Sequence, residues 1–77
     1  MFTLHLTLHG QALEPSHYES FDDLGDGLAN ALDKASLGLQ PRVLAFLLAL
    51  MFRDLRGHST WTWIAADYEI LVAYNDP

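Results

Sequence analysis

The apolar residues of this chain change their spacing twice along its 77 residues. In the first ten positions and again after residue 59 they alternate with polar ones, which is the spacing of a strand with one buried face. Between residues 20 and 56 they recur every three or four positions, which is the spacing of a helix. This order of periods predicts an α+β fold with strands at both ends and helices between them.

The first strand is expected over residues 2–8, where Phe2, Leu4, Leu6 and Leu8 alternate with threonines and histidines and Gly10 marks the end. The following residues are less regular. Pro15 lacks a backbone N–H and excludes a central strand there. An irregular edge strand near Ser16–Glu19 is still compatible with the sequence.

A first helix is predicted to begin after Ser20, whose side chain is suited to cap the backbone N–H of Asp23 three residues later. Gly38 is the expected left-handed residue after the helix. The glycines at positions 25 and 27 each cost a helix up to about 1 kcal/mol relative to alanine. Either the first turn is irregular, or a neighbour packs closely against both positions. The apolar face consists of Phe21, Leu24, Leu28, Leu32 and Ala35.

A second helix is predicted from Pro41, a favourable first helical residue, to about Arg56, with Gly57 ending it. Its middle is apolar on all sides, which is typical of a helix buried on most sides. One stripe combines small and basic residues, and it could pack closely on another backbone or receive an acidic partner. This stripe consists of Arg42, Ala45, Ala49, Arg53 and Arg56.

Two further strands are expected around Thr60–Trp63 and Tyr68–Tyr74, joined by a turn wider than two residues near positions 65–67 because no glycine is present there. The fold class is therefore α+β, in the order β-(β)-α-α-β-β. A small antiparallel sheet of three or four strands carries two helices on one face. The other face is expected to hold His5, Thr7, His9 and part of the tryptophan and tyrosine set.

Length and composition restrict the classes of protein that fit. Residues 1–77 make one domain whose small interior gives marginal stability. Hydrophobic residues make up 51% and cysteine is absent, so self-association, for example as a homodimer, would compensate for the missing covalent reinforcement. The expectation is a cytoplasmic protein without a secretory signal or membrane span. A net charge of −6 argues against direct nucleic-acid binding.

No pattern of residues predicts catalysis or metal binding, so the chain is expected to be neither an enzyme nor a holder of a cofactor. His5 and His9 lie on a strand, where four residues span roughly 13 Å, too far for one ion. A metal site would have to recruit His17 or His58 with a carboxylate. Ser16 beside His17 does not constitute a nucleophile–base pair, because adjacent side chains point apart on a strand.

The aromatic residues of the last two strands have two interpretations. Tryptophan and tyrosine are enriched at binding hot spots, which would make this set an interface. One face of the sheet must also bury large residues under the helices, and packing in the core is the favoured interpretation for most of them. The set consists of Trp61, Trp63, Tyr68 and Tyr74.

The first 33 residues carry six acids and no lysine or arginine, so the whole net charge lies in this half. Asp22, Asp26 and Asp33 share one face of the first helix, and helix-dipole stabilisation explains only the acids of the first turn. These features predict a non-enzymatic protein-binding module that docks on a basic surface of a larger, nucleic-acid-binding complex. The expected contacts are Glu19, Asp22, Asp23, Asp26 and Asp33.

In size, charge and lack of catalytic motifs the chain resembles small phage-encoded anti-CRISPR and other anti-defence proteins, a class-level analogy that implies an inhibitor or decoy. Two other classes fit the sequence. One is a constitutive oligomer or accessory subunit that uses its apolar helix or aromatic sheet face. The other is a domain that binds a small ligand or a metal through its histidines.

Overall fold

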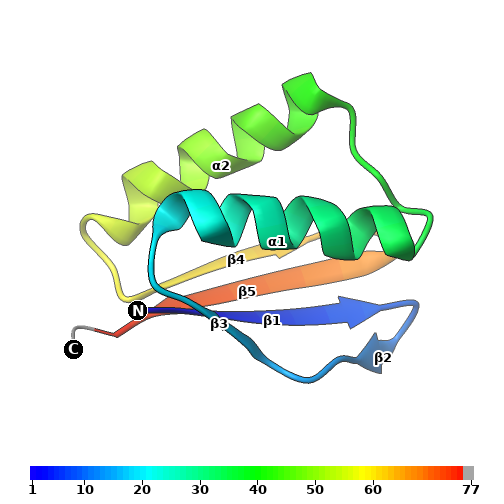
Figure 1. Ribbon diagram of the computed structural model, residues 1–77, viewed down its shortest axis with the longest axis horizontal. Helices are drawn as coiled ribbons and strands as arrows, with labels where there is room; N and C mark the ends of the chain where they lie inside the picture. The colour runs from blue at the N-terminus through cyan, green and yellow to red at the C-terminus, as the bar shows by residue number, and fades with distance from the viewer. Residues whose placement is uncertain (76–77) are drawn as a thin grey trace.

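In the computed structural model, which describes residues 1–75, one antiparallel sheet carries both helices on the same face (Figure 1). The predicted α+β architecture is confirmed, and the sheet has five strand segments instead of three or four. The elements are β1 (Phe2–Leu8), β2 (Gln11–Ala12), β3 (Ser16–Tyr18), α1 (Phe21–Lys34), α2 (Pro41–Leu55), β4 (Thr60–Ile64) and β5 (Tyr68–Tyr74).

The first and last strands form the centre of the sheet. β1 pairs with β5 along its whole length, from Phe2 opposite Tyr74 to Leu8 opposite Tyr68. β4 pairs with the other side of β5 and forms one edge. β2 and β3 both pair with β1 on the edge away from β5, interrupted around Pro15. The predicted edge strand is therefore confirmed, and Pro15 lies in the gap where a missing N–H is tolerated.

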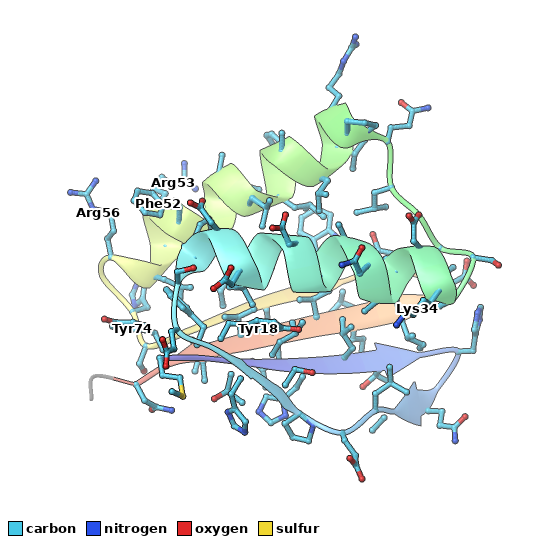
Figure 2. All side chains as sticks on the ribbon, viewed as in Figure 1. Tyr18, Lys34, Phe52, Arg53, Arg56 and Tyr74 are labelled. Carbon is cyan, nitrogen blue, oxygen red and sulfur yellow. The ribbon has the colours of Figure 1, made fainter. Side chains whose placement is uncertain are left out.

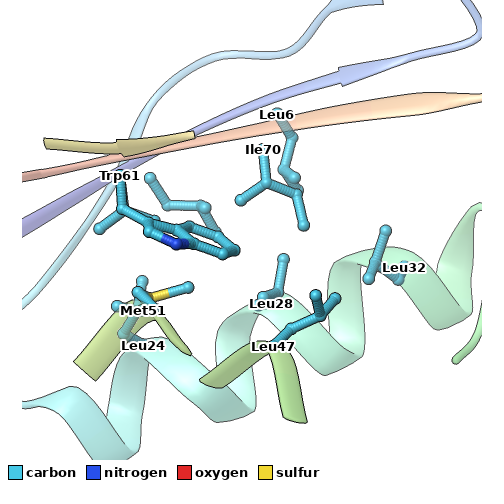
Figure 3. Close-up of a cluster of buried hydrophobic side chains, with 10 residues drawn as sticks. Leu6, Leu24, Leu28, Leu32, Leu47, Met51, Trp61 and Ile70 are labelled. Carbon is cyan, nitrogen blue, oxygen red and sulfur yellow. The ribbon is translucent and has the colours of Figure 1, made fainter. Parts of the chain in front are cut away.

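The hydrophobic core lies between the sheet and the helix layer (Figure 3). Period-two alternation places the even-numbered residues of β1 and β5 and the odd-numbered residues of β4 on the helix side. Helical spacing turns the apolar stripe of α1 toward them. The buried side chains are Leu4, Leu6, Leu24, Leu28, Leu32, Leu47, Met51, Trp61, Ile70 and Val72.

Neither described helix lies on the opposite face of the sheet. By the pairing register this face presents mostly threonine, histidine and glutamate side chains, with two larger apolar ones, Ile64 and Leu71, which are 70% and 38% exposed. The expectation that this face would hold part of the tryptophan and tyrosine set is wrong. Trp61 lies opposite Val72 and Trp63 opposite Ile70, both core residues, so pairing register directs the indoles toward the helices.

The start of α1 follows the prediction, because the Ser20 side chain accepts a hydrogen bond of 3.1 Å from the backbone N–H of Asp23. The end of α1 differs from the prediction. Ser36, with φ of 60°, adopts the left-handed conformation that was expected for Gly38. The N–H of Leu37 donates to the Leu32 carbonyl and that of Ser36 to the Asp33 carbonyl, the pattern of a Schellman motif. The chain turns early because Leu37 then packs against the core.

We expect Ser36→Gly to raise the free energy of unfolding by about 0.5 kcal/mol. A left-handed conformation costs a residue with a Cβ about 1–2 kcal/mol, and the extra freedom of glycine in the unfolded chain offsets roughly half of that. Thermal unfolding should shift up by about 2–4 °C. Ser36→Ala is the control, since it removes the hydroxyl but keeps the Cβ. An equal gain from alanine would contradict the backbone explanation.

Close packing, and not an irregular turn, accounts for the two glycines of α1. A Cβ at Gly25 would lie 3.2 Å from Cδ1 of Leu48 on α2. A Cβ at Gly27 would overlap the ring and hydroxyl of Tyr18 from β3. The two positions therefore let α1 approach a helix on one flank and a strand on the other.

The second helix ends one residue before the predicted Arg56, but it is not buried on most sides. Only Leu47 and Met51 are fully buried in it, whereas Val43, Phe46 and Phe52 are 42%, 59% and 53% exposed. The reason is the single helix layer, since α2 rests on the sheet and touches α1 on one flank, and no described element covers its outer side. An apolar helix therefore remains half exposed.

Candidate protein-binding groove

A groove runs between α1 and α2 on the outer surface of the helix layer. It consists of two adjoining hollows of about 370 and 210 Å³ that share Ala29 and Leu44. Its lining is small or apolar, because Gly25 and Ala29 on α1 face Leu44 and Leu48 on α2. We call this feature the α1–α2 groove.

Three of the predicted acids border this groove. At 100° per residue, Asp22, Asp26 and Asp33 lie within about 40° of one another around α1. All three are exposed, and each lines one of the two hollows. Within residues 1–75 the one ion pair is Arg53 with Asp54, at 3.4 Å between Nε and Oδ1, so no lysine or arginine there neutralises the three carboxylates.

Asp33 is placed by the connection that follows α1. A Cβ at Gly38 would overlap Oδ1 of Asp33, so this carboxylate lies directly against the backbone of Gly38. The glycine that the sequence suggested as a helix terminator therefore makes room for an acid. A larger residue at position 38 would displace the carboxylate from the groove.

The two remaining predicted contacts do not join this row. Asp23 is exposed on α1 about 100° from Asp22, and its backbone N–H serves the Ser20 cap. Glu19 precedes the helix and lines a different hollow. The five predicted acids are thus exposed, and the structure brings three of them together.

The ridge of α2 across the groove carries the small and basic stripe, whose five residues are all exposed. Arg53 pairs with its neighbour Asp54, with side chains 73% and 41% exposed, and such a surface pair contributes little stability. The Arg56 guanidinium lies 5.9 Å from the ring centroid of Phe52 (Figure 2). The helix layer therefore has an acidic side on α1 and a basic side on α2.

An aromatic hollow, which was not predicted from the sequence, adjoins the groove at Phe21. Ring centroids are 4.9 Å apart for Tyr74 and Phe2, 5.9 Å for Phe2 and Phe21, and 5.3 Å for Phe21 and Phe52. Glu19 and Arg56 stand at its border. The only available signal was a phenylalanine or tyrosine near the end of each contributing element, and only the fold brings those ends together.

The predicted aromatic interface residues all lie on the helix side of the sheet. Trp61 is buried, and Trp63, Tyr68 and Tyr74 are half-buried. The two indoles stack with centroids 6.4 Å apart. This placement favours packing over an exposed interface, although Tyr74 also lines the aromatic hollow.

One histidine of the open sheet face has a described side-chain partner. His17 pairs with Thr3 across the β1–β3 ladder, and its Nδ1 lies 3.2 Å from the threonine hydroxyl oxygen. Among residues 1–75, no three His, Asp or Glu side chains come together in an arrangement that could hold a metal ion. The expected absence of enzymatic activity stays a prediction.

Within the described part of the chain, neither helix combines the length and hydropathy required to cross a membrane. Comparisons with protein-family models, with curated proteins and with solved structures found no match for this chain.

Proposed function

We propose that this protein is a non-enzymatic binding module that docks its α1–α2 groove on a basic surface of a partner protein. The observation that carries the proposal is the row of Asp22, Asp26 and Asp33, three exposed carboxylates without a basic partner among residues 1–75. A partner's lysines or arginines would supply the missing counter-charge. Complementary potentials of this kind govern partner choice and association rate.

The apolar lining of the groove supports a protein partner in particular. Carboxylates alone would attract any cation, but Ala29, Leu44 and Leu48 offer surface that a small cation cannot use. An interface needs a desolvated apolar centre with a polar border, and the groove has this composition. The expected partner element is an amphipathic segment with basic residues beside its apolar ones.

A basic surface that normally holds nucleic acid fits these requirements well. Along such a surface, positive side chains are spaced to meet successive phosphates. Carboxylates repeated along one helix face would occupy some of the positions that phosphates otherwise fill. Binding of this protein would therefore exclude the nucleic acid by competition. In this proposal the protein acts as an inhibitor or decoy of a nucleic-acid-binding complex, as anti-defence proteins of similar size do.

We expect the triple substitution Asp22→Lys, Asp26→Lys and Asp33→Lys to abolish capture of the partner from the source cells at low salt. For the unaltered protein, capture should fall steeply as salt rises, because the Debye length shrinks from about 10 Å at 0.1 M to about 3 Å at 1 M. Immobilised protein and mass spectrometry of the retained proteins measure both effects. Duplex DNA or RNA added to the eluted partner should compete with rebinding.

The matched control reverses three exposed acids elsewhere, Glu14, Asp67 and Glu69, and thereby changes the net charge by the same amount. It should retain capture if the position of the acids matters. Equal loss in both triple variants would mean that only overall charge is sensed. A partner still retained at high salt by the α1 variant would overturn the proposed site.

A further inference from the structure

Among residues 1–75 no strand pairs with the outer edge of β4, so this edge is an unpaired row of backbone groups. Two hydrogen bonds determine which residues of β4 direct their backbone groups toward β5. The N–H of Tyr74 donates to the Ser59 carbonyl, and that of Ala65 donates to the Tyr68 carbonyl. In an antiparallel ladder these bonded pairs alternate with non-bonded ones. Trp61 and Trp63 therefore bond toward β5, whereas the N–H and C=O groups of Thr60, Thr62 and Ile64 point away from the sheet.

This edge lacks the features that usually protect a free strand. Natural sheets block such edges with lysine, proline, a bulge or a covering segment. β4 is Thr-Trp-Thr-Trp-Ile, without charge or proline, and its three outward-directed residues are all exposed. The other edge of the sheet differs, since the short segments β2 and β3 flank Pro15 there and leave little continuous edge.

An apolar stripe on α2 lies above the same edge. Leu48 faces α1, and Val43, Phe46 and Leu50 lie on the opposite flank, between 140° and 220° around the helix from Leu48 at about 100° per residue. Because α2 packs over β4 and α1 over β1 and β3, that flank is the one beside the free strand. Strand edge and helix stripe therefore lie on the same flank of the molecule.

We propose that β4 pairs with β4 of a second copy, so that two sheets join into one across a twofold axis at Thr62. An antiparallel register centred on Thr62 aligns all three outward residues, with Thr62 opposite its own mate and Thr60 opposite Ile64. Each of the three aligned pairs exchanges two hydrogen bonds, giving about six in total. The axis is perpendicular to the sheet, so the two α2 helices meet as antiparallel neighbours.

Charge and area both favour a second copy as the occupant. The twofold axis keeps the acidic rows on the two α1 helices apart on the outer flanks, and β4 itself carries no charge. The arginines of α2 stand toward its outer side, about 40–100° around the helix from the centre of the apolar stripe. The stripe and Ile64 supply the apolar contact, since Phe46 is 59% and Ile64 70% exposed. Two copies of this surface would bury on the order of 1,000 Å², the lower range of specific interfaces, so we expect a micromolar dimer.

Hydrogen exchange followed by NMR tests the proposed register directly. In dilute protein the amides of Thr60, Thr62 and Ile64 should exchange rapidly, and those of Trp61 and Trp63 slowly. As concentration rises, protection of the first three should increase in parallel with the dimer fraction measured by sedimentation. A chain that stays monomeric into the millimolar range, or a dimer that leaves these three amides exchanging rapidly, would overturn the proposal.

Variants separate this edge from other contacts. Ile64→Lys and Phe46→Lys should each weaken dimerisation at least tenfold without changing the urea midpoint of the monomer. Leu13→Lys is the matched control, because it places the same charge at a side chain 44% exposed just beyond β2, and it should leave dimerisation unchanged. Equal weakening by all three would contradict the edge contact. None of these positions belongs to the acidic row, so the outcome is independent of the proposed function.

Discussion

Ile70→Ala is expected to remove about 3 kcal/mol or more from the free energy of unfolding. The Ile70 side chain is 0% exposed, on the central strand β5 between Leu6 of β1 and Trp63 of β4. Replacing a buried isoleucine by alanine costs about 2–5 kcal/mol, because the transfer energy is lost and a cavity remains. A chain of this length has roughly 4–11 kcal/mol in total, so the expected loss is between about a quarter and three quarters of its stability.

Urea denaturation measures this loss as a lower midpoint with an unchanged slope. Leu71→Ala is the matched control, since it removes an aliphatic side chain from the neighbouring position on the opposite face of the same strand. Leu71 is 38% exposed, and we expect a cost below about 1 kcal/mol. If both variants lost the same stability, another element would have to cover the open face of the sheet.

Gly27→Ala is expected to destabilise the protein by about 1–2 kcal/mol, even though alanine is the better helix former. The added methyl group would overlap the ring of Tyr18, which is half-buried and packed against the core. Overpacking of this kind costs typically 1–3 kcal/mol, whereas the helix gains at most about 1 kcal/mol. Thermal and urea unfolding of the single variant test the sign of the change.

Gly25→Ala provides a comparison only two residues away in the same helix. There the nearest atom is a terminal methyl group of Leu48 at 3.2 Å, which can move by a few tenths of an ångström. We therefore expect a neutral or slightly stabilising effect. In a Tyr18→Ala background, Gly27→Ala should also become stabilising. A loss that persists without the tyrosine ring would contradict the steric explanation.

The elements of this fold could be predicted because their determinants are local. Period-two alternation identified the strands at both ends, and the Ser20 cap fixed the start of α1. The end of α1 depends on a tertiary contact. Ser36 adopts the left-handed conformation because Leu37 reaches the core, and a rule based on glycine alone selects Gly38 instead.

The exposure of α2 could not be predicted for a similar reason. An apolar pattern on all sides shows that a helix has more apolar surface than one contact can cover, but it does not show how many layers the fold contains. Here the sheet covers Leu47 and Met51, and Phe46 remains exposed. The excess apolar surface that composition indicated is therefore concentrated on one helix and one strand edge.

The candidate site was predictable only in its charged part. Helical geometry alone places Asp22, Asp26 and Asp33 on one face. The apolar lining of the groove comes from Leu44 and Leu48 on another helix, and the sequence does not reveal which flank of α1 that helix approaches. Gly25 is the one local signal of the flank that α2 approaches, since a glycine inside a helix indicates a close neighbour.

The pairing of β1 with β5 has a consequence for how the chain is made. These two central strands lie almost the full length of the chain apart, so the sheet cannot close during synthesis until β5 has left the ribosome. The nascent chain can form its helices early, because helical hydrogen bonds are local. The apolar faces of these helices then remain exposed until the sheet forms. Folding should be slow for so small a domain, since non-local strand pairing limits its rate. Until folding completes, the exposed apolar faces of the two helices favour aggregation.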